Sequence, residues 1–138
     1  MRQSAFIWVL TLVVGITAGS MGHRILSAQL PSIKRTPLLK TDLAEMAGKE
    51  GLVVSLEFAP GVSAGKHYHP AHVWGYILEG VMRLEEVGKP PTLVKPGETF
   101  YEPPKQVHTF TNADTTASLK FLVFALAEKG QPLTIPVP

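Results

Sequence analysis

Proline and glycine punctuation is the feature that most constrains what this sequence can fold into. The chain of 138 residues contains twelve prolines and twelve glycines, and every proline lies at position 31 or later. Proline breaks helices and glycine favours turns, so the apolar runs between them are too short for a helical bundle. Turn signals recur roughly every 8–12 residues, which is typical of a sandwich or barrel. The sequence therefore predicts an all-β domain.

Several runs are specific enough to predict single strands. The near-continuous apolar run 119–126 favours a buried central strand. Residues 33–40 favour an edge strand, because Pro37 interrupts them. Residues 73–78 and 81–87 flank Glu79-Gly80, and we expect them to form a hairpin there.

The first residues differ in character from the rest. Arg2 precedes an uncharged stretch over residues 3–22, whose apolar centre at 5–18 has the length of a signal-peptide core. Cleavage after Ser20 or Ala28 is one alternative, and an uncleaved membrane anchor over residues 5–21 is the other. Both place the domain outside the cytoplasm, periplasmic or secreted. We expect a leader over 1–28, an arm or edge strand over 29–48 and a barrel over 49–138.

Charge and cysteine content exclude several classes of function. The chain has no cysteine, which excludes disulfide scaffolds, thiolate metal sites and cysteine nucleophiles. Its formal net charge of +2 arises from Arg2 and Arg24, both in the predicted leader. The remainder is balanced, so it lacks the basic surface that nucleic acids or anionic membranes require.

Histidines supply the candidate chemistry. Beyond His23 in the leader, the chain has His67, His69, His72 and His108. Residues i and i+2 of a strand face the same side, so His67 and His69 can offer two imidazoles to one divalent ion. His108 is the only distant histidine that can complete the set. Histidines with ordinary hydrogen bonds are the alternative, and the grouping favours a metal site. Imidazole does not decide among iron, copper, nickel, manganese and zinc.

Two segments resemble the paired motifs of cupins. In residues 61–80, Gly61, His67, His69 and Gly80 stand at the spacing of the first cupin motif. In residues 97–112, the second motif is matched by Gly97, Pro103, His108 and Asn112. The sequence is similar to a small, exported, single-domain cupin of the cupin type-2 barrel family. That resemblance implies a jelly-roll β-sandwich or barrel, a small-molecule ligand, and a homodimer formed by exchange of an N-terminal strand.

The resemblance is incomplete at two positions. The glutamate ligand of the first motif would fall at Val73 or, with the other permitted spacing, at Trp74, and neither side chain binds metal. A site of three imidazoles would leave the metal charge uncompensated and make it a stronger Lewis acid. The glycine of the second motif is Lys105, so that turn must differ or the lysine must tolerate its geometry.

Three further residues are weaker candidates for catalysis. His72 follows His69 closely enough to serve as a fourth ligand or proton shuttle, although we favour a position at the rim. Glu57 and Glu102 lie on predicted strands and would serve as bases if they face inward. For Glu102 the favoured interpretation is an outward salt-bridge partner.

Three functions follow from these features. The first is a dioxygenase-like metalloenzyme that uses His67, His69 and His108 to act on a small chelating organic substrate. The second is a non-catalytic module that binds a small ligand or sequesters metal. The third is a cupin isomerase or decarboxylase, which would need an inward base such as Glu57 or Glu102.

Overall fold

The computed structural model describes residues 32–138, so the predicted leader and its cleavage or anchoring lie outside the described residues. These residues form ten strands: β1 (Ile33–Asp42), β2 (Lys49–Phe58), β3 (His67–Tyr68), β4 (His72–Glu79), β5 (Met82–Glu86), β6 (Thr92–Val94), β7 (Thr99–Glu102), β8 (His108–Asn112), β9 (Leu119–Glu128) and β10 (Ile135–Pro136). Within residues 32–138 there is no helix that is long and apolar enough to cross a membrane.

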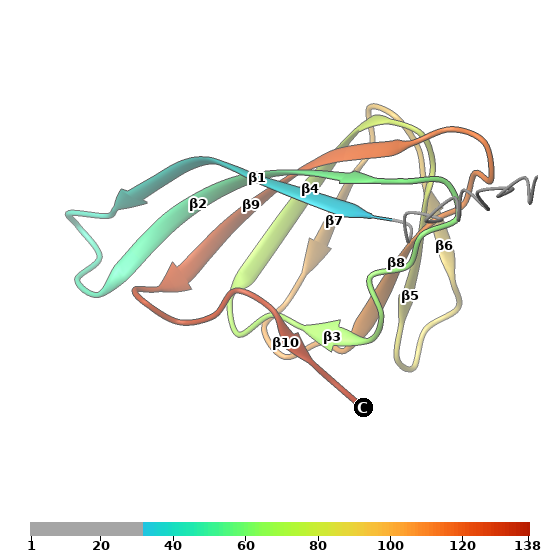
Figure 1. The fold of residues 1–138 in the computed structure, drawn as a ribbon. Coiled ribbons are helices and arrows are strands. Elements are labelled where there is room, and N and C mark those ends of the chain that lie inside the picture. Colours follow the sequence, from blue (N-terminus) through green and yellow to red (C-terminus); the bar gives the residue numbers. More distant parts are fainter. Residues whose placement is uncertain (1–31) are drawn as a thin grey trace, which may run out of the picture.

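The strands make two antiparallel five-stranded sheets, which Figure 1 shows facing each other. One sheet has the order β1-β2-β9-β4-β7, and the other has the order β10-β3-β8-β5-β6. This confirms the predicted all-β jelly roll. β9 lies in the centre of the first sheet and alternates buried with less buried residues along its length. β1 lies at the edge of that sheet, with an irregularity between Pro37 and Leu39.

The predicted hairpin around Glu79-Gly80 is wrong. β4 pairs with β7 and β9, whereas β5 pairs with β6 and β8 in the opposite sheet. Gly80 has a φ of +76°, and a Cβ there would lie 2.6 Å from the Ser118 carbonyl oxygen. The chain therefore makes a tight turn against a neighbouring segment and crosses from one sheet to the other. The local sequence does not distinguish this crossing from a hairpin, because both need a glycine turn.

The core lies between the sheets and is built on aromatic side chains. Phe100, Phe110 and Phe121 contact one another edge-to-face, with ring centroids 5.3–6.2 Å apart. Gly75 on β4 makes room for this cluster, since a Cβ there would lie 2.0 Å from the Phe100 ring. These contacts fix the inner surface on which the histidines lie.

Asn112 anchors the far end of β8 from His108. Its amide nitrogen donates to the carbonyls of Phe58, Ala59 and Ala117, at 2.8–3.3 Å. Its side-chain oxygen accepts from the Asp114 amide at 3.0 Å. A fully satisfied buried amide of this kind fixes loop geometry at little cost.

Candidate metal centre

Short strands bring the three predicted ligands together. His67 on β3 lies directly opposite His108 on β8, and His69 follows β3 in the loop that leads to β4. One ring nitrogen from each histidine lies within 4.8 Å of the others. The three residues are only 1–6% exposed. Three buried imidazoles from two strands and a loop thus meet at one point, an arrangement compatible with a metal ion.

Backbone carbonyls orient all three rings. The Nδ1 atoms of His67, His69 and His108 lie 2.9, 2.7 and 2.9 Å from the carbonyls of Gly65, Leu133 and Gln106, respectively. A carbonyl only accepts, so each Nδ1 carries the hydrogen and donates it. In the neutral ring, Nε2 then holds a lone pair and is free to ligate. Such hydrogen bonds fix tautomer and orientation in metal-binding histidines.

The Nε2 atoms approach one another closely. Those of His67 and His108 are 3.0 Å apart. With both Nδ1 atoms protonated, two lone pairs face each other unless a positive charge lies between them. Burial lowers the pKa of His67 to about 4, and the neighbouring His108 and His69 lower it as well. The carbonyl of Gly65 and the carboxylate of Glu102 oppose this shift without cancelling it. His67 is therefore neutral at physiological pH and ready to bind a cation.

Glu102 is the unexpected member of this group. The outward interpretation of this residue is wrong, because it is fully buried and shares the inner face of β7 with Phe100. Its Oε1 lies 3.0 Å from His108 Nε2, and its Oε2 lies 3.3 Å from His69 Nε2. Burial alone would raise the pKa of Glu102, but contacts with His108 and His69 outweigh it and lower the pKa. An ionised carboxylate thus lies beside two of the three imidazoles.

Lys105, at the glycine position of the second motif, connects that motif to the His69 backbone. Among residues 32–138 it is the only non-glycine residue in the left-handed region, with a φ of +68°. Its amide donates to the His69 carbonyl at 2.8 Å. The lysine therefore adopts the conformation that glycine provides in the motif, and the turn is retained.

A cavity of about 480 Å³ between the sheets opens onto two of the imidazoles, those of His67 and His69. The rest of its wall is mainly apolar and comes from β1, β2, β8, β9 and the C-terminal segment: Arg35, Pro37, Val54, Leu56, Phe58, Ala64, Phe110, Val123, Leu133, Thr134 and Pro136. Size and lining suit a small organic molecule held against the imidazoles.

The other two weak candidates lie away from this cavity. His72 is exposed and alternates along β4 with the buried Val73. Its Nδ1 lies 2.8 Å from the Tyr101 hydroxyl, which belongs to the outer face of β7. Glu57 lies between Leu56 and Phe58 of the inner face and so points to the outer face. Neither residue reaches the histidine group.

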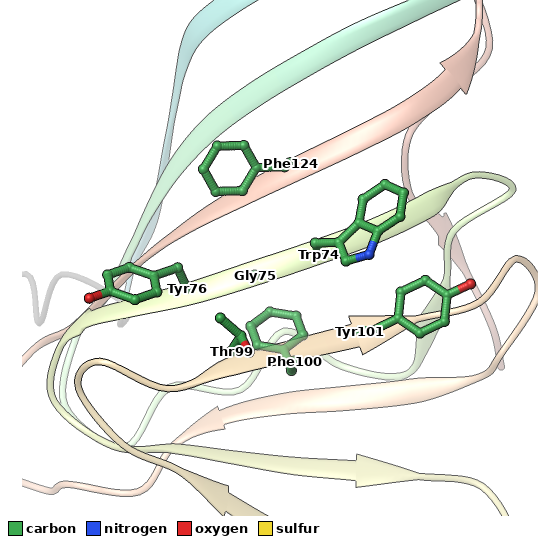
Figure 2. A pocket seen from close by; sticks show the side chains of 7 residues that line it. All are labelled: Trp74, Gly75, Tyr76, Thr99, Phe100, Tyr101 and Phe124. Atoms are coloured by element: carbon green, nitrogen blue, oxygen red, sulfur yellow. The ribbon is translucent and has the colours of Figure 1, made fainter.

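The outer face of β4, β7 and β9 carries an aromatic surface, which Figure 2 shows around a hollow of about 650 Å³. His72, Trp74 and Tyr101 stack there with ring centroids 5.6–6.1 Å apart. Tyr76 and Phe124 extend this surface. Within residues 32–138 the only group of three potential metal ligands is that of His67, His69 and His108, so the candidate chemistry lies on the inner face.

Comparison with known proteins assigns the family. The cupin domain family matches residues 54–125, which is more than half of the chain and includes all three histidines of the site. The chain is a cupin. No protein of curated function matches the sequence significantly.

Solved cupin structures share the fold at low sequence identity. A cupin-like protein from Thermotoga maritima has a TM-score of 0.62 at 22% identity, covering 76% of this chain and 75% of that one. Oxalate oxidase in complex with the substrate analogue glycolate has a TM-score of 0.58 at 23% identity, covering 77% and 61%. The DMSP lyase DddQ from Ruegeria pomeroyi has a TM-score of 0.57 at 21% identity, covering 63% and 43%. The cupin thus spans less than half of that lyase.

Sequence reasoning placed the three histidines on one site but missed the position of Glu102. The available signal was strand alternation. Glu102 stands two residues after Phe100 on the same strand, so both side chains face the same side. Carboxylates are rarely buried, and this general tendency favoured the outward interpretation.

Proposed function

We propose that this cupin holds one divalent metal ion through His67, His69 and His108 and catalyses a dioxygenase-like reaction on a small chelating organic substrate. The observation that carries the proposal is the convergence of three Nε2 atoms whose Nδ1 atoms are all tied to backbone carbonyls. These hydrogen bonds fix each ring so that its Nε2 lone pair is available to a cation. A bound metal ion would supply Lewis acidity and a template for the substrate.

The cavity supports a substrate of a particular kind. Its apolar wall favours a small organic molecule. Among the described residues that line it, Arg35 is the only one with a permanent charge. A guanidinium binds carboxylates and similar oxyanions through paired hydrogen bonds. We therefore expect an oxygen-rich substrate whose anionic group lies toward Arg35 while its chelating oxygens lie toward His67 and His69.

A cupin isomerase or decarboxylase is a second candidate, favoured by the buried carboxylate of Glu102. In an isomerase Glu102 would accept a proton from one carbon of the substrate and return it to another, and in a decarboxylase a proton would have to be delivered to the carbon that loses carbon dioxide; neither reaction consumes oxygen. A non-catalytic module that binds a small ligand is the remaining alternative. The known neighbours include an oxidase and a lyase, so the shared fold does not choose between these reactions.

Metal content tests the proposal first. The full-length chain, purified without a chelating column, should contain about one iron, copper, nickel, manganese or zinc ion per molecule, or bind one on reconstitution. Oxygen uptake with chelating phenols or diketones should then require the metal. Absence of metal after reconstitution would overturn the proposal. A loaded protein that converts substrate without oxygen would support the isomerase or decarboxylase, and one without turnover would support the binding module.

Two predictions about context belong to this proposal. Export depends on residues 1–28, and detection of the chain in the cytoplasmic fraction alone would contradict it. The homodimer would form through the edge strand β1, and the mass of the chain in solution tests it.

A further inference from the structure

We infer that Glu102 is a fourth ligand of the metal, so that a carboxylate from β7 completes the site with His67, His69 and His108. This inference rests on the proposed metal site and adds to it a ligand on a strand where the motifs place none. The position predicted for the ligand carboxylate, Val73 on β4, lies directly opposite Glu102 in the strand pairing. The carboxylate thus reaches the site from the neighbouring strand.

The distances from Glu102 to two of the three imidazoles match those between atoms that share one metal ion. Nitrogen and oxygen ligands lie about 2.0–2.2 Å from such an ion. Two ligands of one octahedral or tetrahedral ion are then about 2.8–3.6 Å apart, by simple geometry from those bond lengths. The Glu102 oxygens lie 3.0 and 3.3 Å from His108 Nε2 and His69 Nε2, and the His67–His108 pair of Nε2 atoms is 3.0 Å apart.

The two Glu102 oxygens lie close to imidazoles whose ring hydrogens are used elsewhere. Both oxygens are buried, and neither has a hydrogen-bond partner among residues 32–138. In the neutral form of His69 and His108 the ring hydrogen is on Nδ1, so the close Nε2 atoms have no hydrogen to donate to these oxygens. Acceptor atoms that approach one another this closely without a hydrogen between them are expected where they share a cation.

The buried charge of Glu102 also favours its role as a metal ligand. A fully buried carboxylate is costly unless an opposite charge neutralises it. No lysine or arginine forms an ion pair with Glu102 in the part of the chain that the structure describes, where its only ion-pair contacts are the two histidines. Those histidines have their Nδ1 hydrogens committed to carbonyls. A divalent cation between Glu102 and the imidazoles would supply the missing charge.

The test is a carboxylate swap in the full-length chain, with metal binding as the readout. Glu102→Gln keeps the size of the side chain and removes its charge. We expect it to lower Mn²⁺ affinity by more than about 100-fold, beyond the 10–100-fold lost when a group that only orients a ligand is removed. Zn²⁺ affinity should fall less, because imidazole suits zinc whereas manganese favours carboxylates. Titration calorimetry and the spectrum of bound Co²⁺ would report affinity and coordination.

The double variant Val73→Glu/Glu102→Val returns the carboxylate to β4 and should restore Mn²⁺ affinity to within about tenfold. It also serves if Glu102→Gln alone does not fold, which circular dichroism would show. Wild-type affinity in Glu102→Gln, with an unchanged Co²⁺ spectrum, would overturn the inference and leave the three-histidine site standing. A wild-type chain that binds none of these ions would overturn the proposed function and this inference together. Glu102→Gln that binds metal normally but has lost turnover would identify Glu102 as a base instead of a ligand.

Discussion

The two faces of the β4–β7 strand pair carry similar functional groups in opposite environments. On the inner face, Glu102 is fully buried and contacts the imidazoles of His69 and His108. On the outer face, His72 contacts the Tyr101 hydroxyl and is open to solvent. Imidazoles contact both faces, so residue type alone does not distinguish a candidate metal site from a surface contact.

Convergence and burial make the difference. The inner histidines have one nitrogen fixed on a carbonyl and the other directed to a shared point, and water is largely excluded. Outer His72 has a single polar partner among residues 32–138 and stacks on Trp74. Charges and lone pairs interact strongly in the buried environment and weakly in the exposed one. A buried polar group needs a partner, and this need is what makes the inner face informative about function.

Removing one inner ligand should have the largest effect. His108→Ala is expected to lower divalent-metal affinity by more than about 100-fold, because a ligand is lost and not merely an orienting partner. His72→Ala is the matched control, since it also removes an imidazole from this region, and its metal affinity should equal that of the wild type. Calorimetry with Ni²⁺ or Zn²⁺ measures both. Stoichiometric metal in His108→Ala, or a large loss in His72→Ala, would reverse the assignment of the two faces.

A methyl group added at an inner-face glycine should destabilise the protein more than one added elsewhere in the same sheet. At Gly75 an added Cβ would meet the Phe100 ring at 2.0 Å, so Gly75→Ala must displace the core cluster. At Gly51 on β2 the nearest atoms would be 3.6 and 3.7 Å away, which is ordinary contact.

We expect Gly75→Ala to lower the free energy of unfolding by about 1–3 kcal/mol, as overpacked cores do. Gly51→Ala should stay neutral or gain up to about 1 kcal/mol, since it restricts the unfolded chain. Urea unfolding of the two variants gives the comparison. Equal stability would show that the Phe100 cluster rearranges without cost.

Acid should weaken the metal-free inner face. The folded-state pKa of His67 is lowered from 6.5 to about 4, so between these values the unfolded chain binds more protons than the folded one. Stability must therefore fall as pH drops through this range. The lowered pKa of Glu102 acts in the same direction at lower pH, because the unfolded carboxyl is protonated first.

The melting temperature of chelator-treated protein, measured from pH 7 to pH 4, tests this dependence. His67→Gln should show a smaller decrease, because the glutamine does not titrate. A melting temperature that is constant between pH 7 and pH 5 would contradict the buried, neutral state of His67.

The grouping of the three imidazoles could be predicted from the sequence, whereas the strand pairing and the buried carboxylate around them could not. The spacing of His67, His69 and His108 is a local pattern, and a period of two on strands is enough to place the first two together. After β4 the chain can turn back to pair with β4 or cross to the other sheet, and the Gly80 turn permits both. Contacts between distant segments decide which of the two occurs. Glu102 lies inside for the same reason, since its partners are more than thirty residues away or on another strand. Long-range packing decided each feature that the local pattern left open.

The smallest effect should come from the residue beside Glu102. Tyr101→Phe removes a hydroxyl that lies 2.8 Å from His72 Nδ1 on the outer face, where Tyr101 is 47% exposed. Such surface changes alter stability by less than about 0.5 kcal/mol. Metal affinity should not change, although Tyr101 and the inferred ligand are adjacent in the chain. If Tyr101→Phe weakened metal binding tenfold, the outer hydrogen bond would have to hold β7 in register for the site, and the two faces would act as one unit. Unchanged metal affinity in Tyr101→Phe, together with a large loss of affinity in Glu102→Gln, would show that these consecutive residues act independently. One strand would then carry a surface contact and a metal ligand side by side.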